Sequence, residues 1–270
     1  MKERDYKAFI VEGEVREPQI ICNMCKIHFK HSNFKILTLP AGQNIYMLWQ
    51  ILKADDFETD IIEVLRENSS ELDSLLTGLT RDDFSEVYLF FDYDGHQNNL
   101  PTKNNLTDVI REMLMNFDNE TENGKLYVNY PMVEALRDFK HGICGNKKEC
   151  YCLLSEFDNY KAMSAQKSEY RDFRKYDFEI WREVLNVFVM RVSCLWGKEE
   201  VITHDTYENL INPFSIYELQ QEHIMTGRVF ILSAFPEFLL DYFTVKFWNA
   251  CIKCPKKFAN TACKPNSHNF

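Results

Sequence analysis

The chain has 270 residues, of which 45% are hydrophobic, enough for one large domain or for a catalytic core with a helical appendage. No apolar run approaches the ~20 uncharged residues of a membrane-spanning helix, and the charged N-terminus lacks the apolar core of a signal peptide, so we expect a cytoplasmic protein without membrane contact. The formal net charge of −10 disfavours a general electrostatic clamp on nucleic acid but leaves room for a local basic channel.

The first half of the chain alternates between strand and helix patterns. In chain order, the patterns predict a strand over Lys7–Val11, a helix over Pro18–Lys30, a strand over Phe34–Leu39, helices over Asn44–Lys53, Asp60–Glu67 and Ser70–Leu76, a strand over Glu86–Phe91, a helix over Leu106–Phe117, a strand over Leu126–Val128 and a helix that starts at Pro131. Strands interleaved with helices predict an α/β fold with a mostly parallel sheet flanked by helices.

The second half is predicted to be mainly helical. Helical spacing of apolar residues covers Phe178–Trp196 and His204–Met225, and Val229–Trp248 is rich in Phe, Leu and Tyr. We therefore expect a catalytic core over 1–140, a mainly helical region for substrate or partner binding over 141–255 and a tail over 256–270. A single merged fold is an equally simple alternative.

The chain contains nine cysteines, an odd number that disfavours a disulfide scaffold in a protein without a secretory signal. Their spacings match no standard zinc finger. We expect reduced thiols, with Cys22 and Cys25 serving as small buried hydrophobes on a helix.

Two predicted strands end in acidic residues. Lys7–Val11 runs into Glu12 and a glycine, and Glu86–Phe91 runs into Asp92 and Asp94. In open parallel sheets, ligands bind just beyond the carboxyl ends of the strands, so these carboxylates are expected on one rim. Alternation along an extended chain would point Asp92 and Asp94 the same way.

Three carboxylates on one rim repel each other unless a cation joins them. Oxygen ligands of this kind suit Mg²⁺ or Mn²⁺, and such an ion can generate hydroxide and stabilise charge on a phosphate. A structural alternative exists, because an Asp-X-Asp often forms a turn or helix cap and Glu-Gly ends many strands. The pair of motifs at two strand ends is the more specific signal.

Three segments resemble a known family. Phe9–Pro18 resembles the opening signature of Toprim domains, most closely in the RloB/AbiLii-like proteins, where a strand, Glu-Gly and a second acidic residue precede a helix. Phe91–His96 resembles the family's Asp-X-Asp element, and Tyr130–Leu136 resembles a weaker element with a Pro and an acidic residue on a helix. The resemblance spans the first half of the chain and implies a Toprim-like core.

The resemblance implies that Glu12 is a general base or metal ligand and that Asp92 and Asp94 are metal ligands. Glu14 is a rival to Glu12, but strand alternation and the adjacent glycine favour Glu12. Tyr93, between the two aspartates, is expected to pack away from the rim.

Further residues are implied in secondary roles. Glu17 and Glu134 would be additional ligands or positioning groups. His96 would contact phosphate, although a surface histidine in a turn is the commoner explanation.

The RloB/AbiLii-like and OLD-type families imply a metal-dependent nuclease that acts on tRNA, other RNA or DNA in bacterial antiphage defence or abortive infection. Relatives commonly work beside an ABC- or SMC-like ATPase, which would be a separate chain here because the sequence has no Walker A pattern. The alternative is a non-catalytic Toprim-like module that serves as an adaptor in a defence complex. Topoisomerase or primase activity is a more distant third possibility.

Overall fold

A computed structural model describes residues 6–42, 44–93, 106–138, 150–166, 170–198 and 200–253 of the chain. These residues form two compact units. The first contains the described residues up to Asp92 and those from 106 to Val128, and the second contains Tyr93 and the residues from Asn129 onward. The chain therefore passes from the first unit into the second directly after Asp92 and again directly after Val128.

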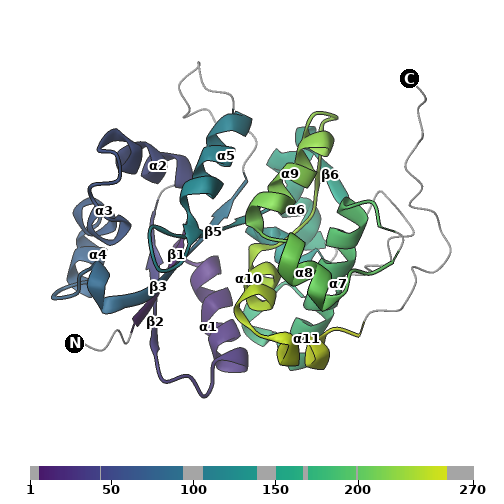
Figure 1. The fold of residues 1–270 in the computed structure, drawn as a ribbon, viewed down its shortest axis with the longest axis horizontal. Helices are drawn as coiled ribbons and strands as arrows, with labels where there is room; N and C mark the ends of the chain where they lie inside the picture. The colour runs from purple at the N-terminus through teal and green to yellow at the C-terminus, as the bar shows by residue number, and fades with distance from the viewer. Residues whose placement is uncertain are drawn as a thin grey trace. The chain divides into compact units, whose positions relative to one another are not determined.

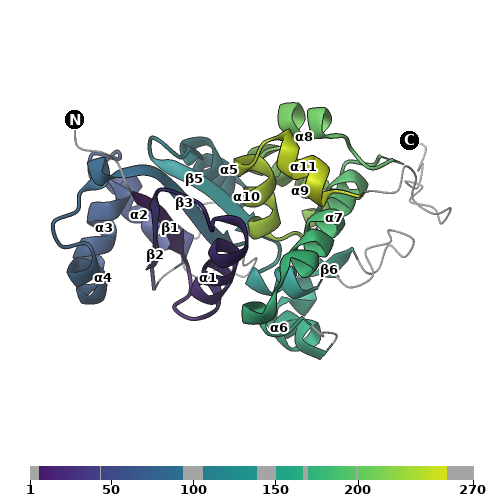
Figure 2. The ribbon, with the colours of Figure 1, turned by 90° about the horizontal axis from the view of Figure 1, so that it is seen from below.

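The first unit is built on a five-stranded sheet with the strand order β2-β1-β3-β5-β4. Its elements are β1 (Tyr6–Val11), α1 (Arg16–His28), β2 (Lys35–Pro40), α2 (Ile45–Ala54), α3 (Ile61–Asn68), α4 (Ser70–Leu75), the 3-10 helix η1 (Arg81–Asp83), β3 (Phe84–Asp92), α5 (Leu106–Asn116), β4 (Asp118–Asn119) and β5 (Gly124–Asn129). Strand β1 pairs in parallel with both β2 and β3, whereas β4 is antiparallel to β5. In Figures 1 and 2, α1 lies on one side of the strands and α2, α3 and α4 lie on the other. The predicted α/β fold with a mostly parallel, helix-flanked sheet is confirmed.

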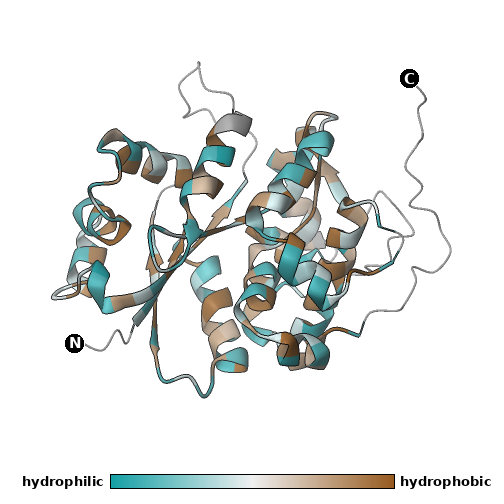
Figure 3. Cartoon of the chain, viewed as in Figure 1, coloured by the Kyte–Doolittle hydropathy of each residue, from teal (hydrophilic) through white to brown (hydrophobic). Residues whose placement is uncertain are grey.

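The central strands are almost fully buried, which explains their continuous apolar sequence. Five of the six residues of β1 are buried, as are six of the nine residues of β3. The ring of Phe9 contacts those of Tyr88 and Phe90, with centroid distances of 5.4 and 5.6 Å. Figure 3 shows that the helices around this core carry both hydrophilic and hydrophobic residues, as expected for helices with one buried face.

Polar side chains fix where several helices begin. Asn44 accepts a hydrogen bond from the backbone N–H of Met47 at the start of α2. Asp60 accepts from the N–H groups of Ile62 and Glu63 at the start of α3. These caps satisfy N–H groups that have no partner within the helix, which accounts for the agreement between the predicted and observed helix starts.

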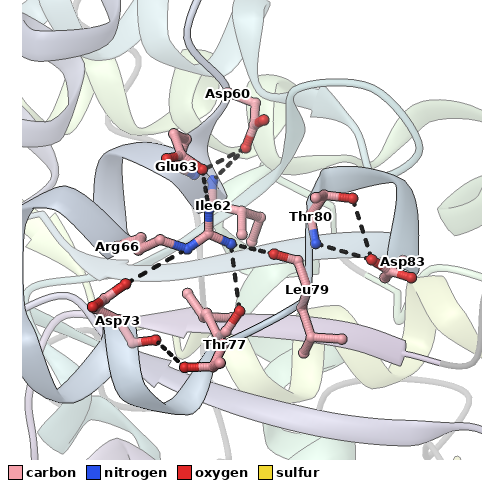
Figure 4. Close-up of polar contacts among 10 residues, drawn as sticks. Asp60, Ile62, Glu63, Arg66, Asp73, Thr77, Leu79, Thr80 and Asp83 are labelled. Atoms are coloured by element: carbon pink, nitrogen blue, oxygen red, sulfur yellow. Dashed lines mark hydrogen bonds and ion pairs between the residues drawn. The ribbon is translucent and has the colours of Figure 1, made fainter.

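Arg66 connects α3, α4 and the loop that follows them, all of which lie between β2 and β3 in the chain (Figure 4). Its guanidinium group pairs with Glu63 on the same helix and donates to the carbonyl oxygen of Leu79. It also lies 3.4 Å from the carbonyl oxygen of Leu76 and 4.0 Å from the carboxylate of Asp73 on α4. One planar donor group thus holds α3, α4 and the following loop in register.

The second unit surrounds the 18-residue helix α7 (Phe178–Leu195), of which eleven residues are buried. The other elements are the 3-10 helix η2 (Val133–Arg137), β6 (Tyr151–Leu153), η4 (Leu154–Glu156), α6 (Phe157–Gln166), η5 (Phe173–Lys175), α8 (His204–Leu210), α9 (Pro213–Ile224), β7 (Arg228–Phe230), α10 (Ala234–Tyr242) and α11 (Val245–Cys251). Strands β6 and β7 pair antiparallel. Among the described residues, no helix is long and apolar enough to cross a membrane.

Two helix predictions in this unit need correction. His204–Met225 is two helices, because Asn212 caps a new helix whose first residue is Pro213, a residue that fits a first turn but not a helix interior. The segment after Pro131 forms only the short 3-10 helix η2, all five residues of which are buried.

The cysteines also depart from expectation at two positions. Cys22 is exposed rather than buried, whereas Cys25 is partly buried. Burial, followed by the nearby Cys22, raises the pKa of Cys25 to about 12, so this thiol stays protonated. Cys194 is disulfide-bonded, so the prediction of reduced thiols is wrong there.

Candidate functional site at the carboxyl edge of the sheet

The carboxyl ends of β1 and β3 bring two of the predicted site residues together. The strands run parallel, and Val11 is in register with Phe90. Glu12 directly follows the last residue of β1, and Asp92 is the last residue of β3. Both residues are partly exposed, whereas Val11 and Phe91 before them are fully buried. The change from buried apolar to accessible acidic residues therefore occurs at the same edge on both strands, as predicted.

A hydrogen bond joins the two strand ends. The backbone N–H of Asp92 donates to Oε2 of Glu12 at 3.3 Å. This contact draws the Glu12 carboxylate across from the end of its own strand to the backbone that carries Asp92. A carboxylate held by a backbone donor keeps further lone pairs for other partners, so Glu12 can accept this bond and still act as a ligand.

Glu17 lies directly behind the turn that follows Glu12. It is 5% exposed and sits in the first turn of α1. Its Oε1 accepts a hydrogen bond of 3.1 Å from the backbone N–H of Gly13. A negative side chain in the first turn is also favoured by the helix dipole. The structure therefore brings Glu12, Glu17 and Asp92 to one edge of the sheet.

Gly13 packs closely against a neighbouring side chain at this turn. A Cβ atom at this position would lie 2.7 Å from Oε2 and 2.9 Å from Oε1 of Glu17. Such distances are shorter than van der Waals contact, and the buried carboxylate would have to move. Glycine therefore allows the Glu17 carboxylate to pack against the backbone beside Glu12.

We expect Gly13→Ala to lower the free energy of unfolding by ~1–3 kcal/mol, because the new methyl group displaces Glu17 and breaks its bond to the backbone. Urea unfolding measures this loss. The matched experiment repeats the substitution in a Glu17→Ala background, where the cost should shrink because no carboxylate remains to be displaced. If Gly13→Ala lowers the free energy of unfolding equally with and without Glu17, the contact between residue 13 and the Glu17 carboxylate does not determine the loss.

Glu14 points towards a different strand end. Its Oε1 lies 3.7 Å from the position that a Cβ atom would take on Gly42, in the turn after β2. This turn is held to β1, since the N–H of Ala41 donates to the carbonyl oxygen of Val11 at 2.7 Å. Glu14 is exposed, so it adds negative charge to the edge beside β2, while Glu12 reaches the backbone of β3.

Tyr93 leaves the edge immediately after Asp92. It is 3% exposed and packs in the second unit, with ring centroids 5.6 Å from Tyr130 and 6.2 Å from Phe157. Burial, followed by the nearby Tyr217, raises the pKa of the Tyr93 hydroxyl, so it stays protonated at neutral pH. Tyr93 is thus a buried residue of the second unit, and its expected packing away from the rim stays a prediction.

For the remaining predicted residues, the described part of the chain gives no test of a role at this edge. Asp94 and His96 lie outside the described residues. Glu134 belongs to the second unit, where it is 2% exposed on η2. Within the described ranges, no group of three or more His, Cys, Asp or Glu side chains is arranged to hold a metal ion. The roles assigned to Asp94, His96 and Glu134 thus stay predictions.

No protein-family model matches the chain, and searches of curated proteins and of solved structures also give no match.

Proposed function

We propose that the chain is a divalent-metal-dependent nuclease whose carboxylate site, of the Toprim type, is formed by Glu12, Asp92 and Asp94. The observation that carries the proposal is the convergence of Glu12 and Asp92 at the carboxyl edge of β1 and β3, with Oε2 of Glu12 3.3 Å from the backbone nitrogen of Asp92. Ligands of open parallel sheets bind at this edge.

The chemistry of the donor set fits a hard divalent cation. Glu12 and Asp92 offer carboxylate oxygens, which Mg²⁺ and Mn²⁺ prefer, and both side chains are accessible enough for an ion to keep waters and to contact a phosphate. Asp94 is expected from the sequence as the third ligand. When bound, such an ion would lower the pKa of a coordinated water and offset charge on the phosphate.

The residues of the chain have separate tasks in this proposal. Asp92 and Asp94 would hold the cation, and Glu12 would be either a further ligand or the general base that accepts a proton from the attacking water. Glu17 is a positioning residue, because its carboxylate holds the Gly13 backbone next to Glu12. Glu134 and His96 are proposed as a secondary acidic group and a phosphate contact, on the strength of the sequence pattern alone.

The biological setting is proposed from the sequence resemblance. In this proposal the protein is a cytoplasmic effector of antiphage defence or abortive infection. It cleaves tRNA, other RNA or DNA and works beside a separate ABC- or SMC-like ATPase. A non-catalytic adaptor with the same edge is the outcome to be distinguished by experiment.

Expression in a bacterial host tests the proposal, with and without a neighbouring ATPase. We expect the wild-type chain to be toxic and to produce new fragments in total RNA or DNA, and we expect Glu12→Ala and Asp92→Ala to abolish both effects. The fragments would also identify the substrate. If the wild type and both variants are equally harmless, with and without the ATPase, the proposal of catalysis is overturned and a binding module is favoured.

A further inference from the structure

The two-stranded sheet of β6 and β7 has one buried and one accessible face. Cys152 and Val229, which pair across the two strands, are buried. The residues that alternate with them are partly or fully exposed, and they are Tyr151, Leu153, Arg228 and Phe230. Because side chains alternate along a strand, these four belong to the face opposite the buried pair.

Arg228 is held in a defined orientation on the accessible face. Its guanidinium carbon lies 5.2 Å from the centre of the Tyr151 ring, within the range of a cation–π interaction. Its Nε donates to Oγ1 of Thr226 at 3.2 Å, and that hydroxyl donates in turn to the carbonyl oxygen of His223 at 2.8 Å. The ring and the hydroxyl thus orient the guanidinium through its plane and its Nε atom.

Arg228 has no carboxylate partner among the residues that the structure describes. Arg66, Arg174 and Arg182 each pair with an acidic side chain. Glu156, whose carboxylate accepts from the N–H of Leu153 at 3.1 Å, forms no ion pair with Arg228. Within the same residues, Nη1 and Nη2 of Arg228 also have no hydrogen-bond acceptor. An oriented, partly exposed guanidinium without a counter-charge presents two donors to an oxyanion.

The neighbouring imidazole adds little charge at neutral pH. His223 on α9 packs against Phe230, with ring centroids 4.6 Å apart. Burial, followed by the nearby Arg228, lowers the pKa of His223, and Glu222 opposes this shift. His223 is therefore mostly neutral at neutral pH, and the cation that an anion meets on this face is Arg228.

We propose that Arg228 binds a phosphate group of the nucleic-acid substrate through Nη1 and Nη2, with Tyr151 as the residue that positions the guanidinium. Two parallel N–H donors of an arginine match two oxygens of a phosphate, and a guanidinium that is already oriented loses less conformational freedom on binding. The inference rests on the proposed nuclease function and deepens it, because it assigns a substrate contact to the second unit. An acidic peptide could use the same two donors, and the experiment separates the two ligands.

Binding of a fluorescein-labelled oligouridine of about 20 nucleotides tests the proposal. Anisotropy is measured on the full chain in EDTA, so that cleavage cannot interfere. We expect Arg228→Gln to weaken binding about tenfold, the loss of a charge-assisted contact, and to lower the slope of log K against log salt by about 0.7, the contribution of one phosphate. Arg228→Lys keeps the charge but loses the paired donors, so it should bind about threefold more weakly with an unchanged slope.

Two substitutions of Tyr151 test its positioning role. Tyr151→Phe keeps the ring beneath the guanidinium and should bind as the wild type does, whereas Tyr151→Leu removes the ring and should weaken binding about threefold. In an Arg228→Gln background, Tyr151→Leu should cause no further loss, because no guanidinium remains to be positioned. An equal loss in both backgrounds would contradict the positioning role.

Arg171→Gln is the matched control, because Arg171 is an exposed arginine of the second unit and loses the same charge. Its affinity should stay within a factor of about two of wild type. If Arg228→Gln failed to fold, as judged by circular dichroism, Arg228→Lys and the two Tyr151 variants would still decide, because they keep the charge on the guanidinium or its replacement.

Four results would overturn the inference: no binding by the wild type, an equal loss in Arg171→Gln, equal competition by polyglutamate and by unlabelled oligouridine, or binding to vesicles of phosphatidylcholine and phosphatidylglycerol in place of the oligonucleotide. Failure of the nuclease itself is distinguishable from each of these. Binding that depends on Arg228 in EDTA, without cleavage in Mg²⁺, would leave the phosphate contact intact and remove the proposed activity. Cleavage by a wild type whose binding does not depend on Arg228 would do the reverse.

Discussion

We expect Asp92→Asn and Glu12→Gln each to lower the proposed Mg²⁺-dependent cleavage by about 100-fold or more, while leaving the fold intact. Each change keeps the size of the side chain and removes one negative charge from the edge where β1 and β3 end. Loss of a single preorganised electrostatic group commonly costs a factor of this size in turnover. The measurement is the initial rate of cleavage of the nucleic acid identified by expression, with the proposed ATPase present where activity requires it.

Asp118→Asn provides the matched control for these variants. Asp118 is an exposed aspartate of the first unit, on β4, and it loses the same charge in the same chemical change. Its rate should stay within a factor of about two of wild type, since surface changes away from a site have small effects. Retention of wild-type rates by Asp92→Asn or Glu12→Gln would contradict the assigned roles.

Arg191→Met will lower the stability of the second unit by ~1–3 kcal/mol, the cost of leaving buried carbonyl oxygens without their hydrogen-bond donor. Arg191 lies on α7 and is 4% exposed. Its guanidinium donates to the carbonyl oxygen of Ile231 at 3.1 Å and to that of Asp138 at 2.5 Å. Methionine fills much of the volume, so the loss would report the polar contacts rather than a cavity.

Urea unfolding measures this effect, with Arg171→Met as the control. Arg171 is exposed and belongs to the same unit, so its replacement should change stability by no more than about 0.5 kcal/mol. A similarly small change for Arg191→Met would mean that the buried contacts are dispensable.

The fold of the first unit was largely predictable because its strands and helices carry strong local signals. The apolar run of β3 and the caps Asn44 and Asp60 depend only on neighbouring residues. The second unit was less predictable. A break at Asn212 and Pro213 lies inside a continuous amphipathic pattern, and η2 is buried by residues far away in the chain.

The candidate site was predictable to the extent that it depends on strand order. Parallel strands place Glu12 and Asp92 at one edge wherever β1 and β3 are neighbours. The hydrogen bond from the Gly13 N–H to Glu17 could not be predicted from the spacing of these residues in the sequence. It depends on α1 beginning at Arg16, which turns the Glu17 side chain back onto Gly13. The departure of Tyr93 into the second unit likewise depends on the distant rings of Tyr130 and Phe157.

Binding of Mn²⁺ to the purified chain, followed by electron paramagnetic resonance, tests most directly whether Glu12 and Asp92 form a cation site, because it needs neither substrate nor partner. We predict that the wild-type chain and Asp118→Asn bind the ion, and that affinity falls at least tenfold in Glu12→Gln and in Asp92→Asn, since each loses a charged ligand. Identical Mn²⁺ titrations for all four proteins would contradict a metal site at this edge of the sheet.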